Sequence, residues 1–149
     1  MQNLHLQSDA VTESPDYNLF SAGQIAAGTF FGSILVGGLM FAFNYSNLGN
    51  KKKAHRTVIL SISCFVLLLV VTIGLFGEMS ERDSKPLTYL LAFGIAIGFW
   101  VLVKNLQGVQ YVNHIAQGGG QVSNWNVAAI VIVVSILYSA LLVLFLMVS

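Results

Sequence analysis

The sequence predicts an all-α polytopic membrane protein built as a bundle of four transmembrane helices. Of its 149 residues, 56% are hydrophobic and only 9% are charged, whereas a soluble domain has about 25% charged residues. The apolar residues also gather in four long segments that lack Asp, Glu, Lys, Arg and His. Each approaches the roughly 20 residues that a helix needs to cross a bilayer. These observations disfavour a soluble enzyme.

The elements follow one another along the chain as a tail and four spans. Residues 1–20 form an acidic N-terminal tail that we expect to be flexible. The transmembrane domain is expected over 21–149, with spans at 21–45, 57–76, 86–103 and 127–148. A buried helix of a soluble protein would be shorter and would show a polar face.

The connecting loops predict an orientation. The loop over 46–56 holds four bases, called here the basic cluster: Lys51, Lys52, Lys53 and Arg56. The positive-inside rule places this loop, and the loop over 104–125, in the cytoplasm. Both termini then lie outside, which is the periplasm if the membrane is a bacterial inner membrane. A second interpretation of the basic cluster is a binding site for anionic lipid head groups.

The third helix is expected to be longer than the bilayer is thick and to continue into the cytoplasm as far as residue 117. Beyond Val103, apolar residues recur at close to helical spacing, and three glycines at 118–120 then end the helix. The recurring residues, called here the 106–115 stripe, are Leu106, Val109, Val112 and Ile115. Such a helix would be about 48 Å long at about 1.5 Å per residue.

Two interpretations of this helix end stay open. The 106–115 stripe packs on the loop of the basic cluster, or it docks a partner with Gln107, Gln110 and His114 as the candidate docking residues. Amphipathic helices usually bury their apolar stripe within their own molecule. Packing on the loop is therefore the expected arrangement.

Small residues at helical spacing predict close helix packing, because helices in lipid associate where their backbones can approach. Three of the four spans contain such residues: Gly28, Gly32 and Gly37 in the first, Gly94 and Gly98 in the third, and Ser135 and Ser139 in the fourth. Packing within one chain is the expected role. A seam between copies of the chain is the alternative.

Several chemistries lack the residues that they need. Ionisable groups are missing from the predicted spans, which disfavours a proton-coupled carrier or a haem protein. His55 and His114 without nearby Cys, Asp or Glu make an incomplete zinc site. A serine with a neighbouring base is not found either, and the net charge of +1 gives no attraction to nucleic acid. We therefore expect no enzyme activity, cofactor, metal or nucleic-acid partner.

Part of the sequence resembles a group of small bacterial inner-membrane proteins with no assigned activity. The matching positions are Gln24-Ile25-Ala26, Phe31-Gly32, Leu35, Gly37-Gly38, Asn44-Tyr45 and Leu48-Gly49, then Leu106-Gln107-Gly108, His114, Gly118-Gly119, Ser123 and Trp125. Ile34 stands where that group has a proline, so no proline kink is expected there. The resemblance implies the four-span inner-membrane architecture and no chemistry.

The function expected from the sequence is that of a non-enzymatic accessory or self-assembling subunit. Its partners would be membrane lipids and either a second copy or a larger membrane protein. One alternative is a small oligomeric transporter or channel, with a polar path lined by Thr29, Ser33, Ser135 and Ser139. Another is an immunity-type protein that blocks a pore-forming toxin.

Overall fold

The computed structural model describes residues 14–76 and 81–148, and the all-α prediction is confirmed for them. The elements in chain order are β1 (Asn18–Leu19), α1 (Ala22–Gly32), α2 (Ile34–Asn47), α3 (Lys51–Phe76), α4 (Glu81–Ala116), β2 (Gly120–Gln121) and α5 (Asn124–Val148). The two short strands pair in parallel, with Asn18 opposite Gly120 and Leu19 opposite Gln121.

Two helices are long and apolar enough to cross a membrane, over Lys51–Gly74 in α3 and Lys85–Ala116 in α4. Only 6% and 11% of their most apolar windows are buried, whereas the core helix of a soluble protein would be mostly buried. A shorter apolar stretch lies at Asn124–Ala140 in α5. Two such helices fit a membrane protein and fall short of the four expected spans.

The expectation of a single span over 21–45 is wrong, because this segment forms a helical hairpin. α1 ends at Gly32 and α2 starts at Ile34. A Cβ on Gly28 would lie 2.6 Å from Met40 Sδ, and one on Gly37 would clash with Thr29. Residues later in α1 lie against residues earlier in α2, so the two helices are antiparallel. The chain therefore returns to the end where it started.

The reversal occurs at Ser33, whose φ of 89° makes it the non-glycine residue with positive φ in the described chain. The chain therefore breaks immediately before Ile34 without a proline, and the expectation that a kink is absent there is wrong. Each arm is short: α1 has 11 residues, or about 16 Å at about 1.5 Å per residue. That is about half of a hydrocarbon core of about 30 Å.

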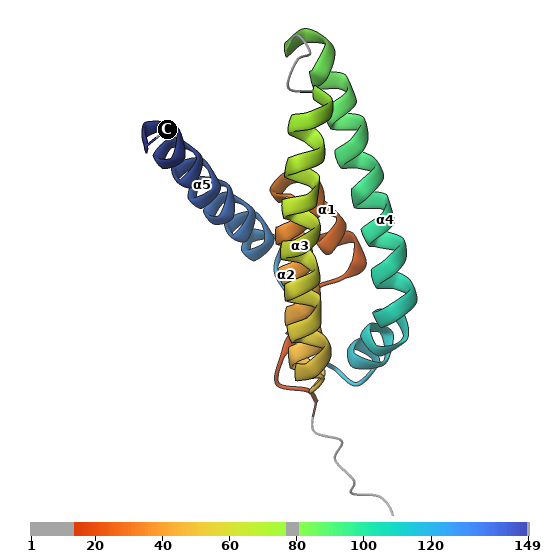
Figure 1. The fold of residues 1–149 in the computed structure, drawn as a ribbon. Helices are drawn as coiled ribbons and strands as arrows, with labels where there is room; N and C mark the ends of the chain where they lie inside the picture. Colours follow the sequence, from red (N-terminus) through yellow and green to blue (C-terminus); the bar gives the residue numbers. More distant parts are fainter. Residues whose placement is uncertain (1–13, 77–80, 149) are drawn as a thin grey trace, which may run out of the picture.

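The hairpin lies at the centre of the molecule, between α3 and α4 (Figure 1). α3 runs antiparallel to α2, since a Cβ on Gly38 would clash with Ser61 and Lys53 Nζ lies 5.7 Å from the Tyr45 ring centroid. The buried core lies between α1, α2, α4 and the start of α5, and α3 contributes the partly buried Ala54 at its edge. The core residues are Phe20, Ile25, Val36, Met40, Phe41, Tyr45, Val103, Val122 and Val127. Figure 1 shows α5 leaving this bundle at a wide angle.

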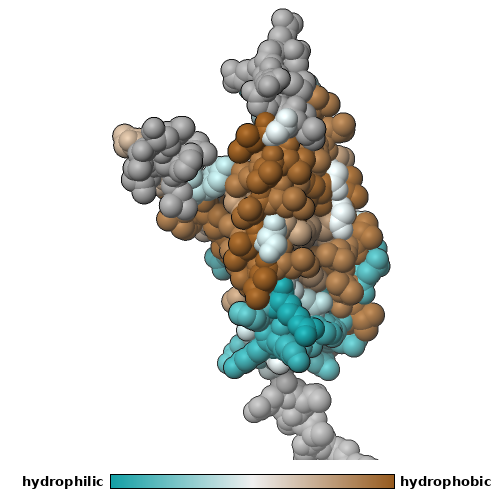
Figure 2. Space-filling view, viewed as in Figure 1, coloured by the Kyte–Doolittle hydropathy of each residue, from teal (hydrophilic) through white to brown (hydrophobic). Residues whose placement is uncertain are grey.

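The surface of the molecule is far more apolar than that of a soluble protein, and several polar side chains are buried. Figure 2 shows a broad apolar surface over the helices and a polar end where α3 begins. Gln24, Asn44 and Gln107 are buried, while Ile73 and Val109 are 70% and 76% exposed. A chain surrounded by lipid satisfies its polar groups internally and presents apolar side chains outward. The surface therefore fits a lipid environment.

Candidate functional site

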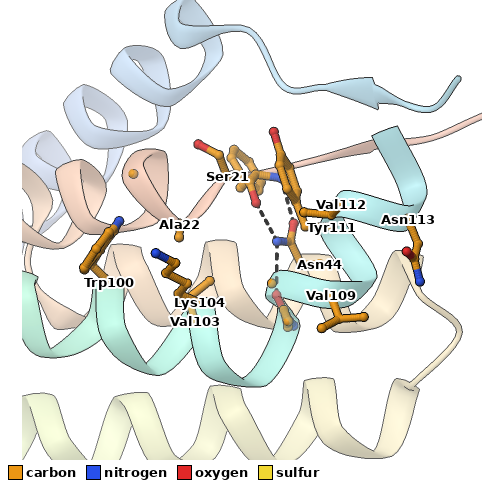
Figure 3. A pocket seen from close by; sticks show the side chains of 14 residues that line it. Ser21, Ala22, Asn44, Trp100, Val103, Lys104, Val109, Tyr111, Val112 and Asn113 are labelled. Carbon is orange, nitrogen blue, oxygen red and sulfur yellow. Dashed lines mark hydrogen bonds between the residues drawn. The ribbon is translucent and has the colours of Figure 1, made fainter. Parts of the chain in front are cut away.

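A cluster of buried amide side chains joins the elements at the polar end of the molecule. Asn44 in α2 accepts a hydrogen bond from Phe20 N at 2.8 Å and donates one to Phe20 O at 2.8 Å. It also donates to Gln107 Oε1 at 3.2 Å, and Gln107 Nε2 donates to Phe41 O at 3.4 Å. Figure 3 shows the bonds of Asn44 as dashed lines. The network ties Phe20, which precedes the N-cap of α1, to α2 and α4.

Gln24 extends this network to α5. It forms a capping box with Ser21 at the start of α1, which satisfies two backbone groups that a helix end leaves unpaired. Its Nε2 also donates to Val122 O at 2.6 Å and to Asn124 Oδ1 at 2.8 Å. Gln24 and Asn44 are both buried, at 7% and 1% exposure.

His114 fixes the end of α4 to the two strands. Its Nε2 lies 3.1 Å from Gly120 O, and its ring stacks on Tyr17 with centroids 4.7 Å apart. Gly119 passes so close that any Cβ there would clash with the imidazole. The ring is only 3% exposed, and Nδ1 has no hydrogen-bond partner. His114 therefore acts as a packing element in this fold.

The candidate docking residues do not form one surface. Gln107 and His114 are buried, and only Gln110 is exposed. The 106–115 stripe is itself exposed, with Val109 at 76% and Val112 at 62%, so it is not packed on the loop of the basic cluster. The reason is that Val103, Gln107 and His114 occupy the inner face of α4. Its apolar residues point outward, opposite to an amphipathic helix in water.

A cavity of about 600 Å³ lies between the start of α1 and the second half of α4. Phe20, Val103, Val109 and Val112 form much of its wall. Lys104 enters from α4, and its Nζ lies 4.9 Å from the Trp100 ring centroid. Figure 3 shows Lys104 and Trp100 on the side of the cavity where Ala22 begins α1. The cavity thus joins one cationic group to a mostly apolar wall.

The predicted packing residues divide into two groups. Gly28, Gly32 and Gly37 serve the contact of α1 with α2, since added Cβ atoms there would clash with Met40, Val36 and Thr29 respectively. Gly94 and Gly98 in α4 have open space where a Cβ would lie. Ser135 and Ser139 line a groove on α5, and Ser139 Oγ donates to Ser135 O at 2.9 Å.

The residues of the predicted polar path are not all brought together. Thr29 and Ser33 border a cavity of about 280 Å³ at the turn of the hairpin, together with Thr72 and Thr88. Ser135 and Ser139 lie on a different surface. Thr29 Oγ1 donates to Ile25 O at 2.8 Å. The hydroxyl groups at the turn therefore form a separate small site.

The basic cluster is solvent-exposed at the start of α3, as is His55. Among residues 14–76 and 81–148, no group of three or more His, Cys, Asp or Glu is placed to hold a metal ion. The expected N-terminal tail lies outside the described residues up to position 13.

Comparison with protein-family models, curated proteins and solved structures finds no match. What the geometry defines is an all-helical chain with two helices able to cross a membrane and a buried polar network at one end.

Proposed function

We propose that this chain is a non-enzymatic integral membrane protein that assembles, through α5, with a second copy or with another membrane protein. The observation that supports the proposal is the departure of α5 from the bundle (Figure 1). Its first half packs on the core through Ile130, Val131 and Val134. Beyond that half, Tyr138 still reaches Phe65, with ring centroids 5.8 Å apart.

From Ser135 onward, α5 offers a shallow groove on one helix face that is suited to another helix. Ile136 in this groove is 62% exposed. The residues that line the groove are Ser135, Ile136, Ser139, Ala140, Val143 and Met147. Apolar contact alone gives helices no preference over lipid, whereas small residues let backbones approach. Ser135 and Ser139 therefore favour a helix as the occupant.

The hairpin suggests a revised topology for this membrane protein. In it, α3, α4 and α5 cross the bilayer, and the hairpin enters and returns to the same side. Asn47 Nδ2 donates to Asn18 O at 3.1 Å, so the chain before α1 lies beside the chain that leads to the basic cluster. With that cluster in the cytoplasm, residue 18 is cytoplasmic as well and the C-terminus is periplasmic. A bacterial inner membrane is the location that the family resemblance favours.

Disulfide crosslinking in native membranes tests the assembly. Cys64 is the single cysteine, so Cys64→Ala combined with Ser139→Cys gives one reactive thiol in the groove. Oxidation should give a homodimer or a heavier adduct. The matched control is Val134→Cys, whose position faces the core of its own chain. Absence of an adduct from Ser139→Cys, or equal adducts from both positions, would contradict the proposal.

A small channel is the second candidate, favoured by the hydroxyl groups of Thr29, Ser33, Thr72 and Thr88, which border an otherwise apolar cavity at the hairpin turn. Irregular backbone inside a bilayer is tolerated where it is buried in protein or lines a water-filled cavity. Purified protein in liposomes should then conduct small ions or solutes, and Ser33→Leu should reduce the flux. Liposomes as tight as protein-free ones would exclude this candidate.

A further inference from the structure

We propose that the cavity between α1 and α4 binds one anionic phospholipid, with its phosphate beside Lys104 and an acyl chain that passes Trp100 toward the middle of the bilayer. This inference uses the membrane location in the proposed function but is independent of assembly through α5. It also differs from the lipid interpretation of the basic cluster, because none of those four bases lines this cavity.

The size and walls of the cavity suit a lipid. Its volume of about 600 Å³ falls within the roughly 300–1,000 Å³ typical of small-molecule sites. Phe20, Trp100 and Val103 supply apolar wall, which matches a hydrocarbon chain. The buried amides of Asn44 and Gln107 at its border already bond to one another and to backbone. The cavity can therefore take an apolar chain without leaving these groups unpaired.

Lys104 supplies the charge that selects an anion. It is exposed, and its described contact is with the Trp100 ring rather than with a carboxylate. A lysine at the end of an apolar span can keep its ammonium group at the level of the lipid head groups. The first turn of α1 lines the opposite wall, and the positive end of a helix dipole adds to the attraction for phosphate.

The apolar wall continues from the cavity toward the middle of the bilayer, which favours a lipid over a soluble anion. Trp100 lines both this cavity and a neighbouring apolar cavity of about 320 Å³ that is bordered by Phe30, Phe93 and Ile97. Figure 3 shows Trp100 on the opposite side of Lys104 from Val109 and Val112, which lie near the end of α4. A ligand with a phosphate and a long apolar chain can contact Lys104 and this apolar wall together. Inorganic phosphate could use only the first contact.

Quenching of Trp100 fluorescence by brominated lipids tests this site. The chain has two tryptophans, so Trp125→Phe leaves Trp100 in the cavity as the reporter. The full-length variant is reconstituted in vesicles that contain phosphatidylglycerol or phosphatidylcholine with brominated acyl chains. Phosphatidylglycerol should quench more strongly. Lys104→Gln should lower that preference about fivefold, as expected for loss of one basic group near an anionic surface, whereas Lys104→Arg should retain it.

Four results would overturn the proposal. Three of them are equal quenching by the two lipids, an unchanged preference in Lys104→Gln, and loss of the preference in the control Lys52→Gln, which would assign the preference to the basic cluster. The fourth is reversal of the quenching by added inorganic phosphate, because the site would then be one for the free anion. Crosslinking at Ser139→Cys is measured separately, so failure of either proposal can be told from failure of the other.

Discussion

At the scale of single residues, Asn44 replaces backbone pairing for the chain that leads into α1. It bonds to both the N–H and the C=O of Phe20 in a site that is 1% exposed. The variant Asn44→Leu leaves the N–H and C=O of Phe20 without a hydrogen-bond partner, and it removes the bond that Gln107 Oε1 accepts. Each buried unpaired group costs about 1–3 kcal/mol, so the unfolding temperature in mild detergent should fall strongly.

Asn47→Ala is the matched control for this prediction. Asn47 makes a comparable bond to Asn18 O, but the bond is exposed, and solvent can replace it. Its unfolding temperature should stay close to that of the wild type. Similar losses in the two variants would mean that burial of the Asn44 amide is not what makes it important.

Ser33 provides a second prediction at this scale, since its φ of 89° and ψ of 167° lie in a region that glycine adopts readily. Side chains in this region cost about 1–3 kcal/mol. Ser33→Gly should therefore raise the unfolding temperature, and Ser33→Val should lower it. Thermal unfolding of both variants, followed by circular dichroism in detergent, measures the effect. The same direction of change in both would contradict strain at this turn.

At the scale of elements, the glycines define where helices touch. A Cβ on Gly37 would clash with Thr29 and lie 3.3 Å from Ile25 O, whereas Gly94 has open space. Gly37→Leu forces the arms of the hairpin apart, and overpacking of this kind costs about 1–3 kcal/mol or more. Gly94→Leu should leave the fold unchanged. Size-exclusion profiles and unfolding temperatures in mild detergent compare the two.

Gly32→Leu should behave like Gly37→Leu, because a Cβ at Gly32 would already lie 2.6 Å from Val36 Cγ2. If Gly32→Leu instead kept wild-type stability and Gly94→Leu lost it, the close contact would lie on α4 and not within the hairpin.

The helix bounds could largely be predicted from the sequence, and the hairpin could not. The last three apolar segments were expected at 57–76, 86–117 and 127–148, and they correspond to α3, α4 and α5 at 51–76, 81–116 and 124–148. Hydropathy does not distinguish one helix over 21–45 from two that fold back, because both arms are equally apolar. The reversal depends on the backbone of Ser33, which no residue pattern marks.

The candidate site was predicted in part, because the amphipathic pattern of α4 was assigned to the wrong face. Leu106, Val109 and Val112 were expected to pack inward, as in water. In lipid the polar residues are the ones that need internal partners, so Gln107 and His114 turn inward and the valines outward. The sequence did contain a signal for the inner face of α4, since Gln107 and His114 are polar residues at helical spacing. Both are buried, as is Asn44 of α2.

At the scale of the whole molecule, the proposed topology uses the hairpin to place the N-terminal segment on the same side of the membrane as the basic cluster. A single span over 21–45 would put residue 16 opposite the basic cluster, whereas the hairpin puts both on one side, as the contact of Asn47 with Asn18 indicates. Single cysteines at Asp16→Cys, Lys52→Cys and Lys85→Cys, each with Cys64→Ala, distinguish these topologies. A membrane-impermeant maleimide added to intact cells should label only Lys85→Cys.

Permeabilised cells provide the control, since all three cysteines should then react. The reason for the expected pattern is geometric. α3 and α4 each have an apolar window able to cross the bilayer. In the proposed topology, Lys85 is therefore on the opposite side of the membrane from the basic cluster, and Asp16 is on the same side. Labelling of Asp16→Cys in intact cells, with Lys52→Cys protected, would restore a single first span and contradict the hairpin. Labelling of Lys52→Cys would reverse the whole orientation and place Lys104, with its cavity, at the outer leaflet.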